Sequence, residues 1–214
     1  MNNTVPVIID YGLGNLFSVK RAFENVGSRP IISRDPKIII ASKLLIIPGV
    51  GAFKSGMEGL RKYKIIEPLT ISLKHGAKLL GLCLGMQLLF DTSGEFGVHQ
   101  GLGLIPGKVK LLNVSSRKKH AKIPHIGWNS LLKPNGVQWR GTILEDIKSC
   151  EMAYFVHSFV VYPKNHLDCL AETEYGDKTF CSVVLHNNIL GTQFHPEKSG
   201  NVGLKILKRF IIGE

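Results

Sequence analysis

The sequence has no apolar run long enough to form a transmembrane helix. Its longest such run, Leu79 to Phe90, is shorter than the roughly 18 residues that a spanning helix requires, and it contains Gln87. The sequence also has no repeat, no low-complexity tract and no linker rich in Pro, Gly or Ser. Because 44% of the 214 residues are hydrophobic, the chain can bury a full core. We therefore expect one globular domain over residues 1–214, with no membrane association.

Cysteine is scarce and is not spaced for a metal site or a disulfide framework. The four cysteines form no CxxC pair and have no histidine at metal-ligand spacing. The amino terminus has no basic segment followed by an apolar segment of signal-peptide length. These features predict a chain that stays in the reducing cytoplasm and needs neither a metal nor another cofactor.

Acidic residues are outnumbered, with 16 Asp and Glu against 27 Lys and Arg, a formal net charge of +11. Such a charge suits nucleic acid, an acidic partner protein or an anionic metabolite. The basic residues are spread along the chain apart from Arg117 to His120, and few aromatic residues lie among them. A groove that binds single strands needs such aromatics, so we expect no nucleic-acid partner. The cluster is a solvated loop or a docking face.

Up to about residue 92, apolar runs of strand length alternate with segments of helical period. The expected strands are Val5 to Asp10, Pro30 to Ser33, Leu44 to Pro48 and Leu79 to Leu82. The expected helices are Leu16 to Val26, a stretch through Ile65 and Leu73, and Leu84 to Phe90. Continuously apolar strands are typical of a parallel sheet covered by helices on both faces, where ligands gather at the carboxyl ends of the strands.

The second half has shorter runs of β-branched and aromatic residues. These runs are Lys108 to Leu112, Met152 to Tyr162, Asp168 to Thr173, Phe180 to His186 and Ile189 to Phe194. Asn187 and Asn188 predict a tight hairpin turn, and Val202 to Ile212 predicts a final amphipathic helix. The expected fold is therefore α/β: a mostly parallel central sheet flanked by helices, with an antiparallel extension in the second half.

A cysteine between glycines lies where an expected strand meets an expected helix, in Gly81-Leu82-Cys83-Leu84-Gly85. A sharp turn at this position strains the backbone of the central residue, which small neighbours permit, and the helix start favours a thiolate. Cys83 is therefore a candidate nucleophile. The alternative is a buried core cysteine between glycines that serve only packing.

A candidate base follows the last expected strand, in His195-Pro196-Glu197. Residues two apart in an extended segment point the same way, so Glu197 can hold one imidazole nitrogen of His195 while the other faces the thiol. The alternative is that His195 is an ordinary surface or core histidine.

A glycine-rich loop, Pro48-Gly49-Val50-Gly51-Ala52-Phe53, follows another expected strand at the same sheet edge. Its backbone N–H groups can receive a developing oxyanion. Without the other two elements it would be an ordinary turn.

These three elements together resemble those of the class I (triad) glutamine amidotransferases. Their sequences are GLCLGMQ at 81–87, FHPEKS at 194–199 and PGVGAF at 48–53. The resemblance covers the whole chain. DYGLGNL at 10–16, PHIGWN at 124–129 and YFVHS at 154–158 are more narrowly similar to the glutaminase subunits of imidazole glycerol phosphate synthases. The valine of the glycine-rich loop also points to that subfamily.

The resemblance implies that Cys83 forms a glutamyl thioester with glutamine, that His195 transfers protons and that Glu197 orients His195. The residues implied to bind glutamine are Gln87, Tyr154, Ser158 and Phe159, and those implied to stabilise the oxyanion are Gly49, Val50 and Gly51. The products would be glutamate and ammonia.

The family passes ammonia directly to a synthase, so the resemblance implies a separate (β/α)₈-barrel cyclase subunit as the partner in a heterodimer. Gly12, Asn15 and Lys198 are implied to lie on the docking face. The resemblance also implies that the isolated chain is a poor glutaminase, because the Val50 amide points at the oxyanion only when ligand occupies the partner's site. A dinucleotide loop is the alternative for Gly12 and Gly14, but the third glycine is missing.

One departure leaves the pathway open: Phe159 stands where the subfamily usually has a tyrosine. Such a change can mark a paralogue that supplies ammonia to a sugar amidotransferase of surface polysaccharide synthesis. A catalytically silent, partner-stabilising subunit is a third hypothesis, against which the intact Cys83, His195 and Glu197 argue.

Overall fold

The computed structural model describes residues 5–115 and 122–213, and the basic cluster Arg117 to His120 lies outside these ranges. The helices are α1 (Leu16–Asn25), α2 (Pro36–Ala41), α3 (Phe53–Lys62), α4 (Ile66–Lys74), α5 (Leu84–Leu88) and α7 (Gly200–Ile212), with 3-10 turns η1 (His166–Asp168) and η2 (Pro196–Lys198). The strands of the first half are β1 (Val7–Ile9), β2 (Ile31–Ser33), β3 (Leu44–Ile47), β4 (Lys78–Leu82) and β5 (Phe90–Ser93). The later strands are β6 (His99–Gln100), β7 (Ile105–Leu111), β8 (His125–Ser130), β9 (Met152–His157), β10 (Phe159–Pro163), β11 (Cys169–Tyr175), β12 (Lys178–His186) and β13 (Ile189–Thr192).

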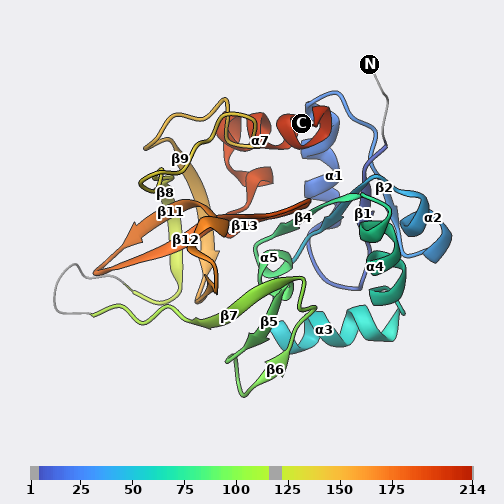
Figure 1. The fold of residues 1–214 in the computed structure, drawn as a ribbon, viewed down its shortest axis with the longest axis horizontal. Helices are drawn as coiled ribbons and strands as arrows, with labels where there is room; N and C mark the ends of the chain where they lie inside the picture. Colours follow the sequence, from blue (N-terminus) through green and yellow to red (C-terminus); the bar gives the residue numbers. More distant parts are fainter. Residues whose placement is uncertain (1–4, 116–121, 214) are drawn as a thin grey trace.

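The main sheet has the strand order β2-β1-β3-β4-β13-β12-β10-β7-β5-β6, with β11 paired to β12 (Figure 1). Strands β2, β1, β3, β4 and β13 run parallel to one another, whereas β13, β12, β10 and β7 pair antiparallel. The predicted α/β fold, with its antiparallel extension in the second half, is therefore confirmed. So is the hairpin turn, since β12 and β13 are joined at Asn187, whose φ is +54°.

The prediction that Met152 to Tyr162 forms one continuous strand is wrong. This run breaks at Ser158 into β9, which pairs with β8 in a separate two-stranded sheet, and β10, which lies in the main sheet. The predicted helix to Phe90 also ends early, because α5 stops at Leu88 and Phe90 begins β5.

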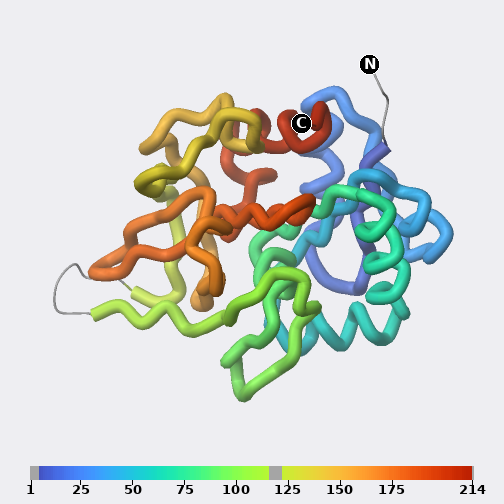
Figure 2. Tube along the Cα trace, viewed as in Figure 1, coloured from blue at the N-terminus to red at the C-terminus, as the bar shows by residue number. Residues whose placement is uncertain are grey.

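Helices cover both faces of the parallel strands. Neighbouring strand residues point to opposite sides of the sheet, so apolar side chains on both sides need a covering layer. Ile8 of β1 packs in one core with Phe23 of α1 and Phe210 of α7. Val7 and Ile9 pack in a second core with residues of α2, α3 and α4. Figure 1 shows α1 and α7 above the central strands and α3 below them, and the tube in Figure 2 shows the red carboxyl-terminal helix against the blue amino-terminal one. In the part of the chain that the structure describes, no helix is both long and apolar enough to cross a membrane.

Candidate active site

Three adjacent parallel strands deliver the three predicted elements to one sheet edge. Strands β3, β4 and β13 are neighbours and run in the same direction. The glycine-rich loop follows β3, Cys83 follows β4 and His195 follows β13. Since the carboxyl ends of parallel strands meet at the same edge, segments that are far apart in sequence converge there.

Cys83 occupies a strained turn between β4 and α5. Its φ is +52° and its ψ is −106°, a region that non-glycine residues rarely adopt. Its N–H donates to Thr192 O at 2.7 Å, and its carbonyl accepts the Gln87 N–H at 3.2 Å. The turn is thus bonded to both β13 and α5, and the thiol is 6% exposed. The strand–turn–helix context predicted for a nucleophile is confirmed.

The two glycines beside Cys83 leave room for neighbouring backbone. A Cβ on Gly85 would lie 1.9 Å from Ile47 O of β3, and a Cβ on Gly81 would lie 2.6 Å from Gly85 O. Real Cβ atoms do not approach oxygens so closely, so the turn can pack against β3 only with glycine at these positions.

His195 and Glu197 form a buried pair, as their spacing predicts. The distance between His195 Nδ1 and Glu197 Oε1 is 2.7 Å, with the two side chains 2% and 3% exposed. The backbone around them is clamped: the His195 N–H donates to Tyr154 O at 3.0 Å, and the Ser199 hydroxyl donates to His195 O at 2.7 Å. Within the described chain, His195 Nε2 and Glu197 Oε2 are buried without a hydrogen-bond partner.

The electrostatics of His195 favour an ion pair with the thiol. Burial alone would lower the pKa of the imidazole, but interactions with Cys83 and then with Glu197 outweigh burial and raise the pKa from 6.5 to about 10. Tyr11 lies close enough to Cys83 to be affected as well, since burial and then the thiolate charge raise the pKa of its phenol. The surroundings of His195 therefore favour its protonated, imidazolium form.

A cavity of about 260 Å³ opens beside Cys83. Its walls are formed by Val50, Gly51, Cys83, Leu84, Gln87, Glu95, Val156, His157, Ser158 and Phe159. Three of the four residues expected to bind glutamine, Gln87, Ser158 and Phe159, are among them. Tyr154 is not: it lies on β9, where its ring contacts Trp128 edge-on and its backbone holds His195. Tyr154 therefore supports the backbone of His195, and its contact with glutamine stays a prediction.

The glycine-rich loop borders the same cavity. Val50 and Gly51 line it, and Gly51 has a φ of +111°. Gly49 is packed instead: a Cβ there would lie 2.7 Å from Gly85 N and 2.8 Å from the Tyr11 hydroxyl. Tyr11 also donates to Pro48 O at 2.5 Å, which fixes the start of the loop. Val50 and Gly51 of the loop therefore border the cavity, whereas Gly49 packs against α5 and Tyr11.

Glu95 lines the cavity, although no sequence motif indicated it. Its Oε2 accepts the Phe53 N–H at 2.6 Å, so it ties the end of the glycine-rich loop to the segment after β5. Gln193 is a second residue that sequence reasoning missed, although it lies two positions before His195. Its side chain contacts both Cys83 and Gln87.

The predicted docking residues Gly12, Asn15 and Lys198 are all exposed. Gly12 has a φ of +88°, and its N–H donates to Asp10 Oδ1 at 3.1 Å. The side chain of Asn15 caps α1 by accepting the Ser18 N–H at 3.2 Å. Lys198 belongs to η2, which contacts α1. Two of the three residues thus lie on elements that touch.

Comparisons with known proteins agree with this geometry. A family model described as glutamine amidotransferase class-I matches residues 7–213. The imidazole glycerol phosphate synthase subunit HisH of Syntrophotalea carbinolica is 44% identical over 206 residues, which cover 95% of this chain and 98% of that protein. The protein of the same name from Geobacter metallireducens is 42% identical over 209 residues, which cover 97% of this chain and 97% of that protein.

Solved structures share the fold at lower identity. A crystal structure of a glutamine amidotransferase superposes with a TM-score of 0.72 at 18% identity, covering 96% of this chain and 97% of that one. The structure of PurLQS from Thermotoga maritima gives a TM-score of 0.69 at 19% identity, with 97% and 96% coverage.

Proposed function

The chain belongs to the class-I glutamine amidotransferase family, and on that premise we propose that it is the glutaminase subunit of an imidazole glycerol phosphate synthase in histidine biosynthesis. It hydrolyses glutamine and passes the ammonia to a separate cyclase subunit. The relatives that are 42% and 44% identical carry the name of that synthase. The observation that carries the chemistry is the strained Cys83 turn beside the buried His195–Glu197 pair and the cavity.

The first half of the reaction forms a thioester. The Cys83 sulfur attacks the side-chain amide carbon of glutamine, and the thiol proton resides on His195 Nε2, the atom without another partner. Glu197 stabilises the imidazolium through its 2.7 Å contact with Nδ1. The developing oxyanion is received by the N–H groups of Val50 and Gly51. His195 then gives its proton to the leaving nitrogen, and ammonia departs.

The second half releases glutamate. Neutral His195 takes a proton from water, whose oxygen attacks the thioester carbon, and the bond to sulfur breaks to regenerate the thiolate and imidazolium. The sum is glutamine and water to glutamate and ammonia. No step needs a group beyond the described side chains and backbone.

The cavity walls suit the amino-acid end of glutamine. The carboxylate of Glu95 offers negative charge to the α-ammonium group. Gln87 donates through Nε2 to Phe159 O at 3.0 Å, while its Oε1 accepts no hydrogen bond from the described residues and is free to accept one from substrate. Ser158 lies at the break between β9 and β10, where it faces the same cavity.

We place the cyclase, a (β/α)₈ barrel, on the surface formed by α1, η2 and β9. Turn η2 contacts both α1 and β9, so these elements form one continuous face. Exposed apolar side chains gather there, with Phe17 of α1 74% exposed and Trp128, which packs on β9, 52% exposed. Large exposed apolar groups are typical of protein interfaces. Asn15, which caps α1, and Lys198 of η2 are exposed on these elements, and Gly12 lies just before α1.

The departure at Phe159 does not favour the sugar-amidating alternative. The contact that this residue makes with Gln87 comes from its backbone carbonyl, which any side chain would supply. Assay of the chain with each kind of synthase separates the two functions: glutamine-dependent formation of imidazole glycerol phosphate supports the proposal, and activity with the sugar amidotransferase alone rejects it.

The Cys83→Ala variant tests the chemistry. In complex with the cyclase it should release no glutamate from glutamine, while ammonium salts still serve as the nitrogen donor. The matched control is Cys150→Ala, because Cys150 is an exposed free thiol and should be dispensable. Glutamine turnover that survives in Cys83→Ala would refute the nucleophile assignment.

A further inference from the structure

Gln193 is fully buried at the end of β13 and touches the nucleophile. Its Nε2 donates to Cys83 Sγ at 3.7 Å, and its backbone N–H donates to Ser182 O at 2.9 Å. The side chain is 0% exposed. A buried amide held by β12 therefore points a donor at the sulfur.

The orientation of this amide is determined by Gln87. Gln87 Nε2 lies 3.0 Å from Phe159 O and 3.2 Å from Gln193 Oε1. A carbonyl oxygen can only accept, so Gln87 must present its NH₂ group to both neighbours. Gln193 must then turn its oxygen to Gln87 and its NH₂ group to Cys83.

Two histidines extend the same network on the other side of Phe159 O. His157 Nδ1 lies 3.0 Å from that oxygen and must donate to it, which leaves His157 Nε2 as an acceptor for His125 Nδ1 at 3.1 Å. His125 Nε2 then accepts from Asn129 Nδ2 at 3.3 Å. Burial lowers the pKa of His125 to about 4 and that of His157 to about 3, so both rings are neutral near pH 7. Each hydrogen bond thus has one permitted direction.

We propose that Gln193 is a further catalytic residue, whose side-chain N–H stabilises the Cys83 thiolate and whose orientation is enforced by Gln87 and the Phe159 carbonyl. The inference deepens the proposed function and rests on Cys83 as the nucleophile. A hydrogen bond to a charged acceptor is stronger than one to a neutral acceptor, so this contact favours the thiolate over the thiol. As a thiol, Cys83 donates only a long hydrogen bond of 3.8 Å to Val156 O.

The titratable groups that act on Cys83 are few, which makes its ionisation a clean readout. Among the described residues, His195 and Tyr11 have pKa values that respond directly to Cys83, Glu197 acts through His195, and the Glu95 carboxyl lines the same cavity as Cys83. His157 responds to His195 in turn. None of these side chains is altered by a substitution at Gln193.

The test measures the rate of alkylation by iodoacetamide against pH in the full chain carrying Cys150→Ser, which removes the exposed thiol. The loss of one charge-assisted hydrogen bond in Gln193→Leu should raise the apparent pKa of Cys83 by about one unit. Gln193→Glu should raise it further, because it places a negative charge beside the sulfur. Gln100→Glu is the matched control: Gln100 is exposed on β6, and the pKa should not move.

Two additional variants keep the test decisive. Should Gln193→Leu fail to fold, Gln193→Asn retains the amide but withdraws it from the sulfur and should give the same upward shift. Gln87→Leu, which frees the Gln193 amide to rotate, should give a smaller shift. An unchanged Cys83 pKa in folded Gln193→Leu or Gln193→Asn overturns the inference. That result would leave the proposed function standing, because the proposed function depends on whether Cys83→Ala abolishes glutamate release.

Discussion

Replacement of Glu197 by glutamine isolates the charge that supports His195. The substitution keeps the size of the side chain and an oxygen that can accept from Nδ1, but it removes the negative charge 2.7 Å from the ring in a pair that is only 2–3% exposed. A hydrogen bond between charged groups contributes about 1.5–3 kcal/mol, so kcat/KM for glutamine should fall about 10- to 100-fold. Removing the counter-charge should also bring the pKa of His195 down from about 10 toward 6.5.

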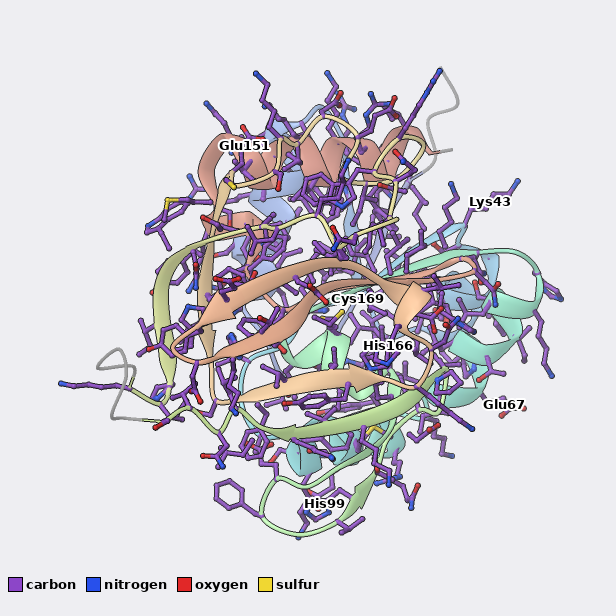
Figure 3. The ribbon with its side chains drawn as sticks, turned by 60° about the vertical axis from the view of Figure 1, so that its left-hand side comes forward. Lys43, Glu67, His99, Glu151, His166 and Cys169 are labelled. Atoms are coloured by element: carbon purple, nitrogen blue, oxygen red, sulfur yellow. The ribbon has the colours of Figure 1, made fainter. Side chains whose placement is uncertain are left out.

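Two measurements check this prediction on the same protein. Glutamate release with the cyclase present gives kcat/KM, and the imidazole resonances of His195 followed by NMR give its pKa. Glu67→Gln is the control, because Glu67 is exposed on α4 at the periphery of the molecule (Figure 3), and it should change neither quantity. A Glu197→Gln variant with parental kcat/KM and an unmoved His195 pKa would refute the reasoning.

Three further predictions follow from the geometry. Gly85→Ala places a Cβ 1.9 Å from Ile47 O and should lower the free energy of unfolding, measured in urea, by about 3 kcal/mol. Gly94→Ala is the control and should change this free energy little, because the nearest atom to its Cβ is 3.9 Å away. Equal stabilities of the two variants would contradict the packing account. The pKa of His195 is raised from 6.5 to about 10 in the folded protein, so the stabilisation by protonated His195 is complete below pH 6.5 and is lost as the pH rises through 10. Between these pH values the free energy of unfolding should therefore fall more steeply for the parent than for His195→Asn. Identical slopes would exclude the ion pair. Glutaminase activity of the isolated chain should be low and should rise when the cyclase and its ligand are added; full activity of the chain alone would exclude activation by the partner.

The continuously apolar strands predicted the parallel half of the sheet, because a strand buried on both faces needs apolar residues at every position. Helix α3 had no such signal. Its start at Ala52 has no side-chain cap, and it contains two glycines that lower helix propensity. The structure explains them: a Cβ at Gly59 would lie 2.3 Å from Tyr11 O, and one at Gly56 would lie 3.0 Å from the Leu88 methyls. These glycines are required by packing between segments that are distant in sequence, which a local pattern does not reveal.

The residues proposed to be catalytic could be proposed from the sequence because each has a local signature: glycines beside Cys83, and a carboxylate two residues after His195. Residues that reach the site from elsewhere could not. Glu95 enters the cavity wall through a hydrogen bond to Phe53, 42 positions away, and Gln193 contacts a sulfur 110 positions away. Their roles depend on how the strands are ordered in the sheet, which sequence periodicity does not specify.

Cysteine location separates the nucleophile from the other thiols. Cys169 lies within the antiparallel part of the sheet (Figure 3), and Cys181 is buried on the neighbouring strand, where burial raises the pKa of its thiol. A thiol with a raised pKa, like that of Cys181, stays protonated and unreactive. Cys83 alone borders the cavity in the part of the chain that the structure describes.

The central claim is tested most directly by trapping the covalent intermediate. The complex with the cyclase is mixed with isotopically labelled glutamine, quenched in acid during turnover, digested and analysed by mass spectrometry. The account predicts one glutamyl group on the peptide that contains Cys83 and none on the peptide that contains Cys150. Turnover without label on Cys83, or label on another residue, would contradict it.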